Sequence, residues 1–175
     1  MTERYPYASA RTECARRMLV DADACPVRRE IARAAERHEI EALFFANSSQ
    51  ENAGTANPRT VQVADGPDAA DFAIATQCRA GDIVVTDDIG LAALVAGKGA
   101  RAISSRGRLF RAETLPLLLE ERHRSRKARR AGCRTRGPRA LSVPDRTRFT
   151  CALELLLRKA DSLDRRTGSR GAEIP

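Results

Sequence analysis

Short apolar runs alternate along the chain with longer stretches whose apolar residues recur at helical spacing. The runs at 18–20, 40–46 and 82–86 predict buried strands, the alternating stretch 60–64 predicts a short strand, and 100–103 predicts the last strand. Each periodic stretch predicts a helix, and these stretches cover 27–39, 68–79, 89–96, 113–130 and 145–160. This alternation favours a Rossmann-like α/β fold: a mostly parallel sheet with helices on both faces, followed by C-terminal helices.

The domain organisation follows from the length of 175 residues and from where the pattern stops. We expect one domain over 18–160, a disordered extension over 1–17 and a frayed tail over 161–175. Inside the domain, residues 113–140 are expected to form a basic helical arm. No Gly-x-Gly-x-x-Gly motif follows the first run, so a dinucleotide-binding fold is not supported.

The net charge of +8 is unevenly placed. Residues 18–100 hold seven Lys and Arg against thirteen Asp and Glu, whereas residues 101–140 hold thirteen against three. This asymmetry favours a polyanionic partner, with nucleic acid ahead of a membrane, although an Arg-rich solvated surface is the alternative interpretation. The candidate nucleic-acid-binding residues are Arg106, Arg122, Arg124, Arg126, Lys127, Arg129 and Arg130.

The cysteines and histidines do not have the spacing of a metal site. The five cysteines are scattered without a Cys-x-x-Cys motif, and His38 and His123 stand apart. This argues against zinc and against a disulfide framework, and it favours reduced thiols in the cytoplasm. No run is long enough to span a membrane, and the first residues lack the apolar core of a secretory signal.

Acidic residues follow two of the predicted strands. Asp21 and Asp23 come directly after the first apolar run, and Asp87 and Asp88 come after the run that ends at residue 86. The carboxyl ends of parallel strands lie at the edge of the sheet where ligands bind. Because carboxylates one residue apart repel each other unless a cation lies between them, a divalent-metal site is the first hypothesis.

A third acidic segment lies on the predicted 68–79 helix. Asp68 and Asp71 are three residues apart and therefore share a face of that helix. Mg²⁺ and Mn²⁺ prefer oxygen ligands, and such ions activate water and neutralise charge that develops on a phosphodiester. The candidate metal ligands are Asp21, Asp23, Asp68, Asp71 and Asp88.

Simpler roles exist for some of these acids. Asp68 is a natural N-cap for its helix, and Asp23 can cap the helix that begins near residue 26. Asp21, Asp71 and Asp88 are harder to explain in this way, because each flanks an apolar stretch without a basic partner nearby in sequence.

Several motifs resemble the YaiI/YqxD family of uncharacterised bacterial proteins. The resemblance covers about residues 18–159. The motifs are Asp-Ala-Asp-Ala-Cys-Pro-Val at 21–27, Ala-Asn at 46–47, Asp-Ala-Ala-Asp at 68–71, Gly-Asp-Ile-Val-Val-Thr-Asp-Asp-Ile-Gly-Leu-Ala at 81–92, Arg-Gly at 106–107, Gly-Pro at 137–138 and Asp-Arg at 145–146 with Phe149.

The resemblance implies a PIN-like nuclease fold and a set of catalytic acids. Nucleases of that kind carry one acid after the first strand, one on a central helix and one in a Thr-x-Asp after a later strand. These roles correspond to Asp21, Asp71 and Asp88. The resemblance also implies Asp23 and Asp68 as auxiliary acids, and Thr86 and Asn47 as auxiliary residues at the same edge. The implied activity is metal-dependent hydrolysis of nucleic acid, with RNA favoured and Mg²⁺ or Mn²⁺ as cofactor.

Two other functions remain open. A phosphatase of the haloacid-dehalogenase type also has Asp-x-Asp after its first strand, with Asp21 as nucleophile. That mechanism needs a lysine before the final acids, whereas Lys98 follows them. The other alternative is a nucleic-acid-binding protein without catalytic activity, in which the acids are structural.

Overall fold

The computed structural model describes residues 16–22, 25–47, 59–64, 66, 68–131 and 139–168. Its sheet has the strand order β3-β2-β1-β4-β5-β6. The strands are β1 (Arg17–Asp21), β2 (Glu41–Asn47), β3 (Arg59–Val63), β4 (Ile83–Val85), β5 (Arg101–Ile103) and β6 (Leu109–Phe110). The helices are α1 (Arg28–Arg37), α2 (Ala69–Gln77), α3 (Ile89–Gly97), α4 (Leu115–Arg130) and α5 (Val143–Gly168). The predicted α/β class is confirmed.

The first five strands are parallel, and β1 lies at the centre of the sheet. Val20 of β1 is opposite Phe44 of β2 on one side and opposite Val85 of β4 on the other. β6 pairs antiparallel with β5, so the expectation that 100–103 is the last strand is wrong. β6 has two residues, too few to show a hydrophobic period.

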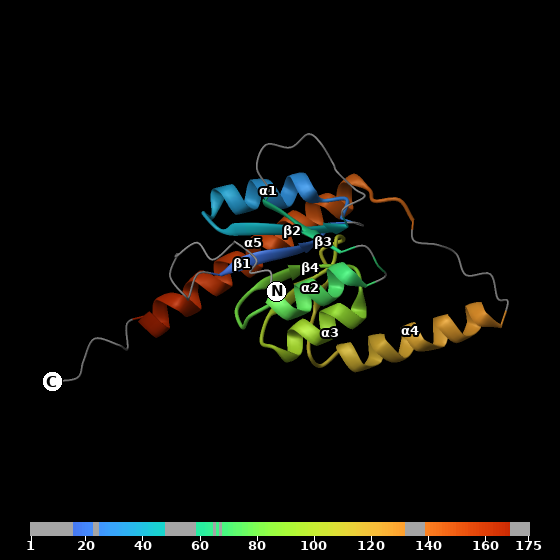
Figure 1. Ribbon diagram of the computed structural model, residues 1–175. Helices are drawn as coiled ribbons and strands as arrows, with labels where there is room; N and C mark the ends of the chain where they lie inside the picture. The colour runs from blue at the N-terminus through green and yellow to red at the C-terminus, as the bar shows by residue number, and fades with distance from the viewer. Residues whose placement is uncertain are drawn as a thin grey trace, which may run out of the picture.

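Helices cover both faces of the sheet (Figure 1). Met18 and Val20 of β1 pack in a core with residues of α1 and α5, whereas Leu19 packs in a second core with residues of α2, α3 and α4. Alternate side chains of one strand therefore enter different cores. Burial on both faces explains why the inner strands β1, β2 and β4 read as continuous apolar runs, whereas β3, which lies at the edge of the sheet and is mostly exposed, alternates.

Two predicted boundaries are wrong. Arg17, placed in a disordered extension, opens β1, where its guanidinium lies 2.8 Å from a carboxylate oxygen of the buried Asp82. α5 continues past residue 160 to Gly168, since no glycine or proline interrupts it before that point. The rest of the predicted extension and the end of the tail, 1–15 and 169–175, lie outside the described residues, as does 132–138 of the arm. None of the described helices combines the length and the apolar character needed to cross a membrane.

The strand order reverses direction between β1 and β4. The chain passes from β1 through α1 to β2 on one side, and it returns from β3 through α2 to β4 on the other side of β1. In open α/β sheets, ligands bind at the carboxyl ends of the strands where the order reverses in this way. Asp21 ends β1 and Thr86 follows β4, so both lie at this position.

Candidate functional site

Thr86 connects the ends of the two strands at the reversal. Its side chain is buried, and its hydroxyl donates a hydrogen bond to Oδ2 of Asp21 at 3.4 Å. The same hydroxyl oxygen accepts a hydrogen bond from the backbone N–H of Asp88 at 3.0 Å. Thr86 thus orients the Asp21 carboxylate and fixes the start of the loop that carries Asp88.

Asp88 is held by the N-terminus of α3 and by a helix distant in sequence. Its Oδ1 accepts from the backbone N–H groups of Gly90 at 2.5 Å and Leu91 at 3.1 Å, which makes Asp88 the N-cap of α3. Arg122 of α4 donates to both carboxylate oxygens, at 3.0 and 2.8 Å. A Cβ at position 90 would lie 2.7 Å from Nη1 of Arg122, so glycine leaves room for the guanidinium there.

Asp71 lies in the first turn of α2 and is crowded by other carboxylates. Partial burial first, and then repulsion from Asp21, Asp88 and Asp68, raise the pKa of Asp71 to about 6, although Arg122 opposes the shift. Asp71 therefore lies within electrostatic reach of acids from β1, from the start of α2 and from the start of α3. We call Asp21, Asp68, Asp71 and Asp88 the acidic edge.

Asp68 does not act as the side-chain cap that the sequence suggests. It occupies the N-cap position of α2, but its backbone is left-handed, with φ of 63°, and its carboxylate makes no capping hydrogen bond. A capping side chain needs an extended backbone to reach the free N–H groups of the first turn. The exposed carboxylate of Asp68 instead adds negative charge beside Asp71.

The donor set at the acidic edge suits a hard cation, but it is not assembled as a metal site. Carboxylate and hydroxyl oxygens are the ligands that Mg²⁺ and Mn²⁺ prefer. Among the residues that the structure describes, no three His, Cys, Asp or Glu side chains form a group that could hold an ion. Asp88 is already paired with Arg122, and Asp23 and the Asn47 side chain lie outside the described residues.

Three of the predicted nucleic-acid-binding residues are engaged in ion pairs with acidic side chains. Arg122 is engaged with Asp88, and Arg106 lies at the end of β5, where it contacts Asp145. Arg124 pairs with Glu120 one turn away on α4. The remaining predicted residues are exposed in the second half of α4, and they are Arg126, Lys127, Arg129 and Arg130.

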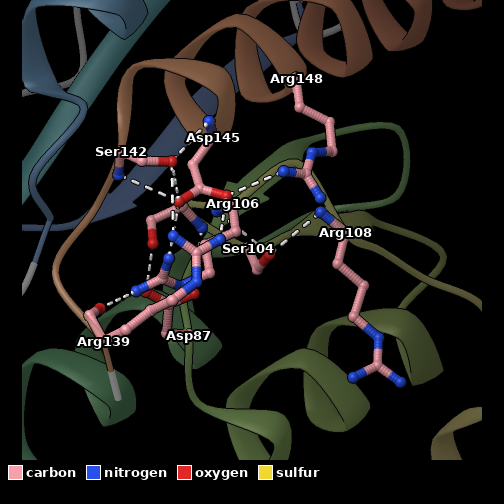
Figure 2. A network of polar contacts seen from close by, with 9 residues as sticks. Asp87, Ser104, Arg106, Arg108, Arg139, Ser142, Asp145 and Arg148 are labelled. Atoms are coloured by element: carbon pink, nitrogen blue, oxygen red, sulfur yellow. Dashed lines mark hydrogen bonds and ion pairs between the residues drawn. The ribbon is translucent and has the colours of Figure 1, made fainter.

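Asp145 is the centre of a polar network that sequence reasoning missed (Figure 2). The residue has no exposed surface, and its carboxylate accepts from the backbone and hydroxyl of Ser142 and from Arg106, Arg139 and Arg148. These hydrogen bonds, those from Ser142 first, hold the pKa of Asp145 well below its usual range. The Ser-x-x-Asp spacing before α5 was the available signal, but it indicated only a helix start.

Asp87 connects this network to the acidic edge. Its carboxylate accepts from the backbone N–H of Ser105 at 3.0 Å and from the Ser105 hydroxyl at 2.5 Å. Asp87 directly precedes Asp88, and Ser105 directly precedes Arg106. The two polar groups therefore occupy successive strand ends, after β4 and after β5, on the same edge of the sheet.

Cys25 and Lys98 are two other residues that could take part in covalent chemistry, but neither is available as a free reactive group. Burial raises the pKa of the Cys25 thiol to about 11, so it is not a thiolate nucleophile at neutral pH. The amine of Lys98, the lysine considered for a phosphatase mechanism, donates to the backbone carbonyl of Ala75 in α2. Lys98 follows α3, whereas Asp21, the nucleophile in the phosphatase mechanism, lies at the end of β1.

The comparison with family models matches residues 19–159 to the model described as "Uncharacterized BCR, YaiI/YqxD family". The chain belongs to the YaiI/YqxD family. The matched residues include the whole acidic edge and the network around Asp145. No solved structure gives a significant match.

Relatives of this YaiI/YqxD protein come from several bacteria. A UPF0178 protein of Vibrio atlanticus is 43% identical over 82% of this chain and 99% of its own length. A UPF0178 protein of Listeria monocytogenes is 39% identical over 83% of this chain and 97% of its own length. One from Bacillus velezensis is 38% identical over 80% of this chain and 84% of its own length. The similarity therefore extends over nearly all of these relatives.

Proposed function

We propose that this protein is a metal-dependent nuclease that hydrolyses phosphodiester bonds, with RNA as the favoured substrate. The observation that carries the proposal is that Thr86 links Asp21 and the start of the Asp88 loop at the strand reversal between β1 and β4, with Asp71 within electrostatic reach of both acids. Asp21, Asp71 and Asp88 come from β1, α2 and the start of α3. Carboxylates that repel one another are costly to keep together, which favours a role that requires a cation.

The proposed cofactor is Mg²⁺ or Mn²⁺, which lowers the pKa of a bound water and neutralises charge on the phosphodiester. Asp21 and Asp71 supply carboxylate oxygens from the sheet and from the helix beside it. Thr86 keeps the Asp21 carboxylate oriented through its 3.4 Å hydrogen bond. Asp88 supplies a third carboxylate, fixed in direction by the N-terminus of α3.

Arg122 brings the basic helix to the acidic edge. Because its guanidinium holds Asp88 at 2.8 Å, the start of the basic part of α4 lies beside the carboxylates. The exposed cations farther along α4 are then in line to neutralise successive backbone phosphates without reading the base sequence. Figure 1 shows α4 extending away from the sheet, which leaves this part of the helix accessible.

One observation favours a second candidate, a nucleic-acid-binding protein without catalytic activity. The Arg122 guanidinium already supplies the positive charge that Asp88 requires. If this ion pair persists when nucleic acid is bound, the acidic edge is a structural cluster, and α4 carries the whole function. The two candidates differ in turnover, not in binding.

The test is cleavage of a fluorescently labelled single-stranded RNA with Mn²⁺, compared between wild type and Asp21→Asn. We expect the substitution to reduce the rate at least about 100-fold, because it removes a charge that orients the cation and leaves the fold intact. Glu36→Gln, on the exposed side of α1, removes the same charge away from the site and should cleave like wild type. Binding of RNA without any cleavage by the wild type would favour the second candidate instead.

A further inference from the structure

Three arginines surround the buried Asp145, and they come from separate segments. Arg106 follows β5, Arg139 precedes α5, and Arg148 lies in the second turn of α5. Their guanidinium nitrogens are 2.9, 2.8 and 2.9 Å from the Asp145 carboxylate. We call Arg106, Arg139 and Arg148 the arginine cluster, and Figure 2 shows it grouped around this one acid.

The arginine cluster has more positive charge than its acid can neutralise. The Asp145 side chain is 1% exposed, whereas those of Arg139 and Arg148 are 62% and 60% exposed. Each of these two arginines uses one Nη atom on Asp145, although a guanidinium carries five N–H donors. The cluster therefore presents two partly satisfied guanidinium groups to solvent around a carboxylate that solvent cannot reach.

The backbone around the cluster is closely fitted. Gly107 has a φ of 79°, and a Cβ there would lie 2.8 Å from backbone atoms of Arg148 and Phe149. The turn that carries Arg106 is thus pressed against the first turns of α5. Ser104 strengthens this turn, because its hydroxyl oxygen accepts from the backbone N–H groups of residues 106 and 108 at 3.3 and 3.0 Å. The N-terminus of α5 adds a positive dipole at the same place.

The cluster lies at the strand end next to the acidic edge. The contact between Asp87 and Ser105 joins the two, since Asp87 precedes Asp88 and Ser105 precedes Arg106. Arg146 also lies in this region, but its Nη1 is 2.8 Å from Oε1 of Glu30. This ion pair neutralises Arg146, so it does not add to the excess positive charge of the cluster. A nucleic-acid strand that binds at the acidic edge is therefore expected to place a further phosphate at the arginine cluster.

We propose that Arg106, Arg139 and Arg148 form a binding subsite for a backbone phosphate of single-stranded nucleic acid, beside the acidic edge. The planar guanidinium fork matches a phosphate group and gives charge-assisted hydrogen bonds to it. Asp145 positions Arg139 and Arg148 by holding one end of each, so that their other N–H groups point in fixed directions. Arg106 is fixed at both ends, because its second Nη donates to the backbone carbonyl of Arg139, and it adds its charge to the subsite. This inference rests on the proposed function, which identifies the ligand as nucleic acid. The inference adds Arg139 and Arg148 to the residues that contact the nucleic acid.

The test is binding of a labelled 12-nucleotide single-stranded RNA, and of a DNA of the same sequence, measured by fluorescence anisotropy with EDTA present. In Arg139→Gln/Arg148→Gln, we expect affinity to fall about tenfold or more near 0.1 M salt. The slope of log affinity against log salt should fall by about 0.7, which is the value for one lost phosphate contact on a single strand. Arg106 and its ion pair with Asp145 remain in this variant, and thermal unfolding checks that the fold is kept.

A charge-matched control separates a subsite from a general loss of positive charge. Arg33→Gln/Arg79→Gln removes two exposed arginines, one on α1 and one after α2, and should bind within about threefold of wild type. Arg139→Lys/Arg148→Lys keeps both charges but loses the fork, so we expect the salt slope to be retained and the affinity to be intermediate.

Equal binding by the arginine-cluster variant and the control variant would overturn the inference, and so would a wild type that binds neither oligonucleotide at low salt. Because EDTA removes metal-dependent cleavage from the measurement, the result is independent of catalysis. A protein that binds as described but cleaves no RNA would refute the nuclease proposal and leave the subsite supported. Equal loss of RNA and DNA binding would assign the contact to phosphate rather than to the sugar.

Discussion

The acidic edge and the arginine cluster both combine carboxylates with guanidinium groups, but carboxylates are in excess at the acidic edge and guanidinium groups are in excess in the arginine cluster. At the acidic edge, three other carboxylates act on Asp71, Arg122 pairs with one of them, Asp88, and the pKa of Asp71 is raised to about 6. In the arginine cluster, one carboxylate shares three arginines, and the pKa of Asp145 is lowered. Folding thus works against ionisation of Asp71 and in favour of ionisation of Asp145. The first arrangement is suited to an added cation and the second to an added anion.

The largest expected effect is the loss of stability on removing the charge at the centre of the arginine cluster. Asp145→Asn leaves three guanidinium groups around a buried amide, so we expect the melting temperature to fall more than in any other variant described below. Since the folded pKa is lowered, the stabilisation is complete above about pH 4 and is lost as the pH falls further. Melting curves of both proteins at pH 7 and pH 3 check this. Equal melting temperatures at pH 7 would contradict the account.

A smaller loss is expected where the turn after β5 meets α5. Gly107→Ala forces a Cβ to within 2.8 Å of backbone and strains a residue with positive φ, at a cost of about 2–4 kcal/mol. Gly81→Ala is the matched control, because Gly81 also has positive φ but has no atom within 4 Å of the added Cβ. It should cost about 1 kcal/mol, from backbone strain alone. Urea unfolding of the two variants measures the difference. An equal loss in the free energy of unfolding would mean that the close contact at Gly107 does not contribute to stability.

The acidic edge should respond to charge removal in the opposite direction from Asp145. Asp71→Asn is expected to stabilise the protein by about 1 kcal/mol at pH 7.5, a discounted value because the side chain is partly exposed. Because the folded pKa is raised, ionisation of Asp71 destabilises the protein progressively as the pH rises from about 4 to about 6, so the advantage of the variant should be complete above about pH 6 and vanish near pH 4. Thermal unfolding at these pH values, in EDTA, makes the comparison. Destabilisation at pH 7.5 would show that Asp71 is a structural residue.

The smallest expected effect is a change in Mn²⁺ affinity on replacing Arg122, which pairs with Asp88. Arg122→Gln removes the partner that competes with a cation for Asp88, and a partly exposed ion pair of about 1 kcal/mol corresponds to about fivefold tighter Mn²⁺ binding. Arg124→Gln, two residues along the same helix, breaks an ion pair with Glu120 and should leave Mn²⁺ affinity unchanged. Titration calorimetry measures both. Weaker Mn²⁺ binding in Arg122→Gln would indicate that Arg122 supports the cation site instead of competing with it.

The same contrast shows what could be predicted from the sequence. The acidic residues Asp21 and Asp88 could be placed on one edge because each follows a buried parallel strand, a local pattern. The ion pair of Asp88 with Arg122 could not be predicted, since 34 residues separate them and many other arginines were available. The ion pair of Asp145 with Arg106 was missed for the same reason, since 39 residues separate them. Arg139 and Arg148 lie within six residues of Asp145, but the sequence does not show that their side chains turn toward it.

Element boundaries followed a similar rule. Long apolar runs and helical periods located five strands and five helices, but β6 has only two residues and its pairing with β5 depends on the turn between them. The cap assigned to Asp68 failed because a left-handed backbone, which sequence does not reveal, turns the side chain away from the helix start. Local physical rules thus gave the elements, and long-range contacts decided the chemistry.

The central claim is that the carboxylates at the reversal between β1 and β4 jointly bind one cation. Titration of Mn²⁺ into the metal-free protein, followed by calorimetry, tests it most directly with wild type, Asp21→Asn and the control Glu36→Gln. The account predicts saturable binding by wild type and Glu36→Gln, and at least about tenfold weaker binding by Asp21→Asn. Undetectable binding by the wild type, or equal affinity in all three proteins, would contradict it.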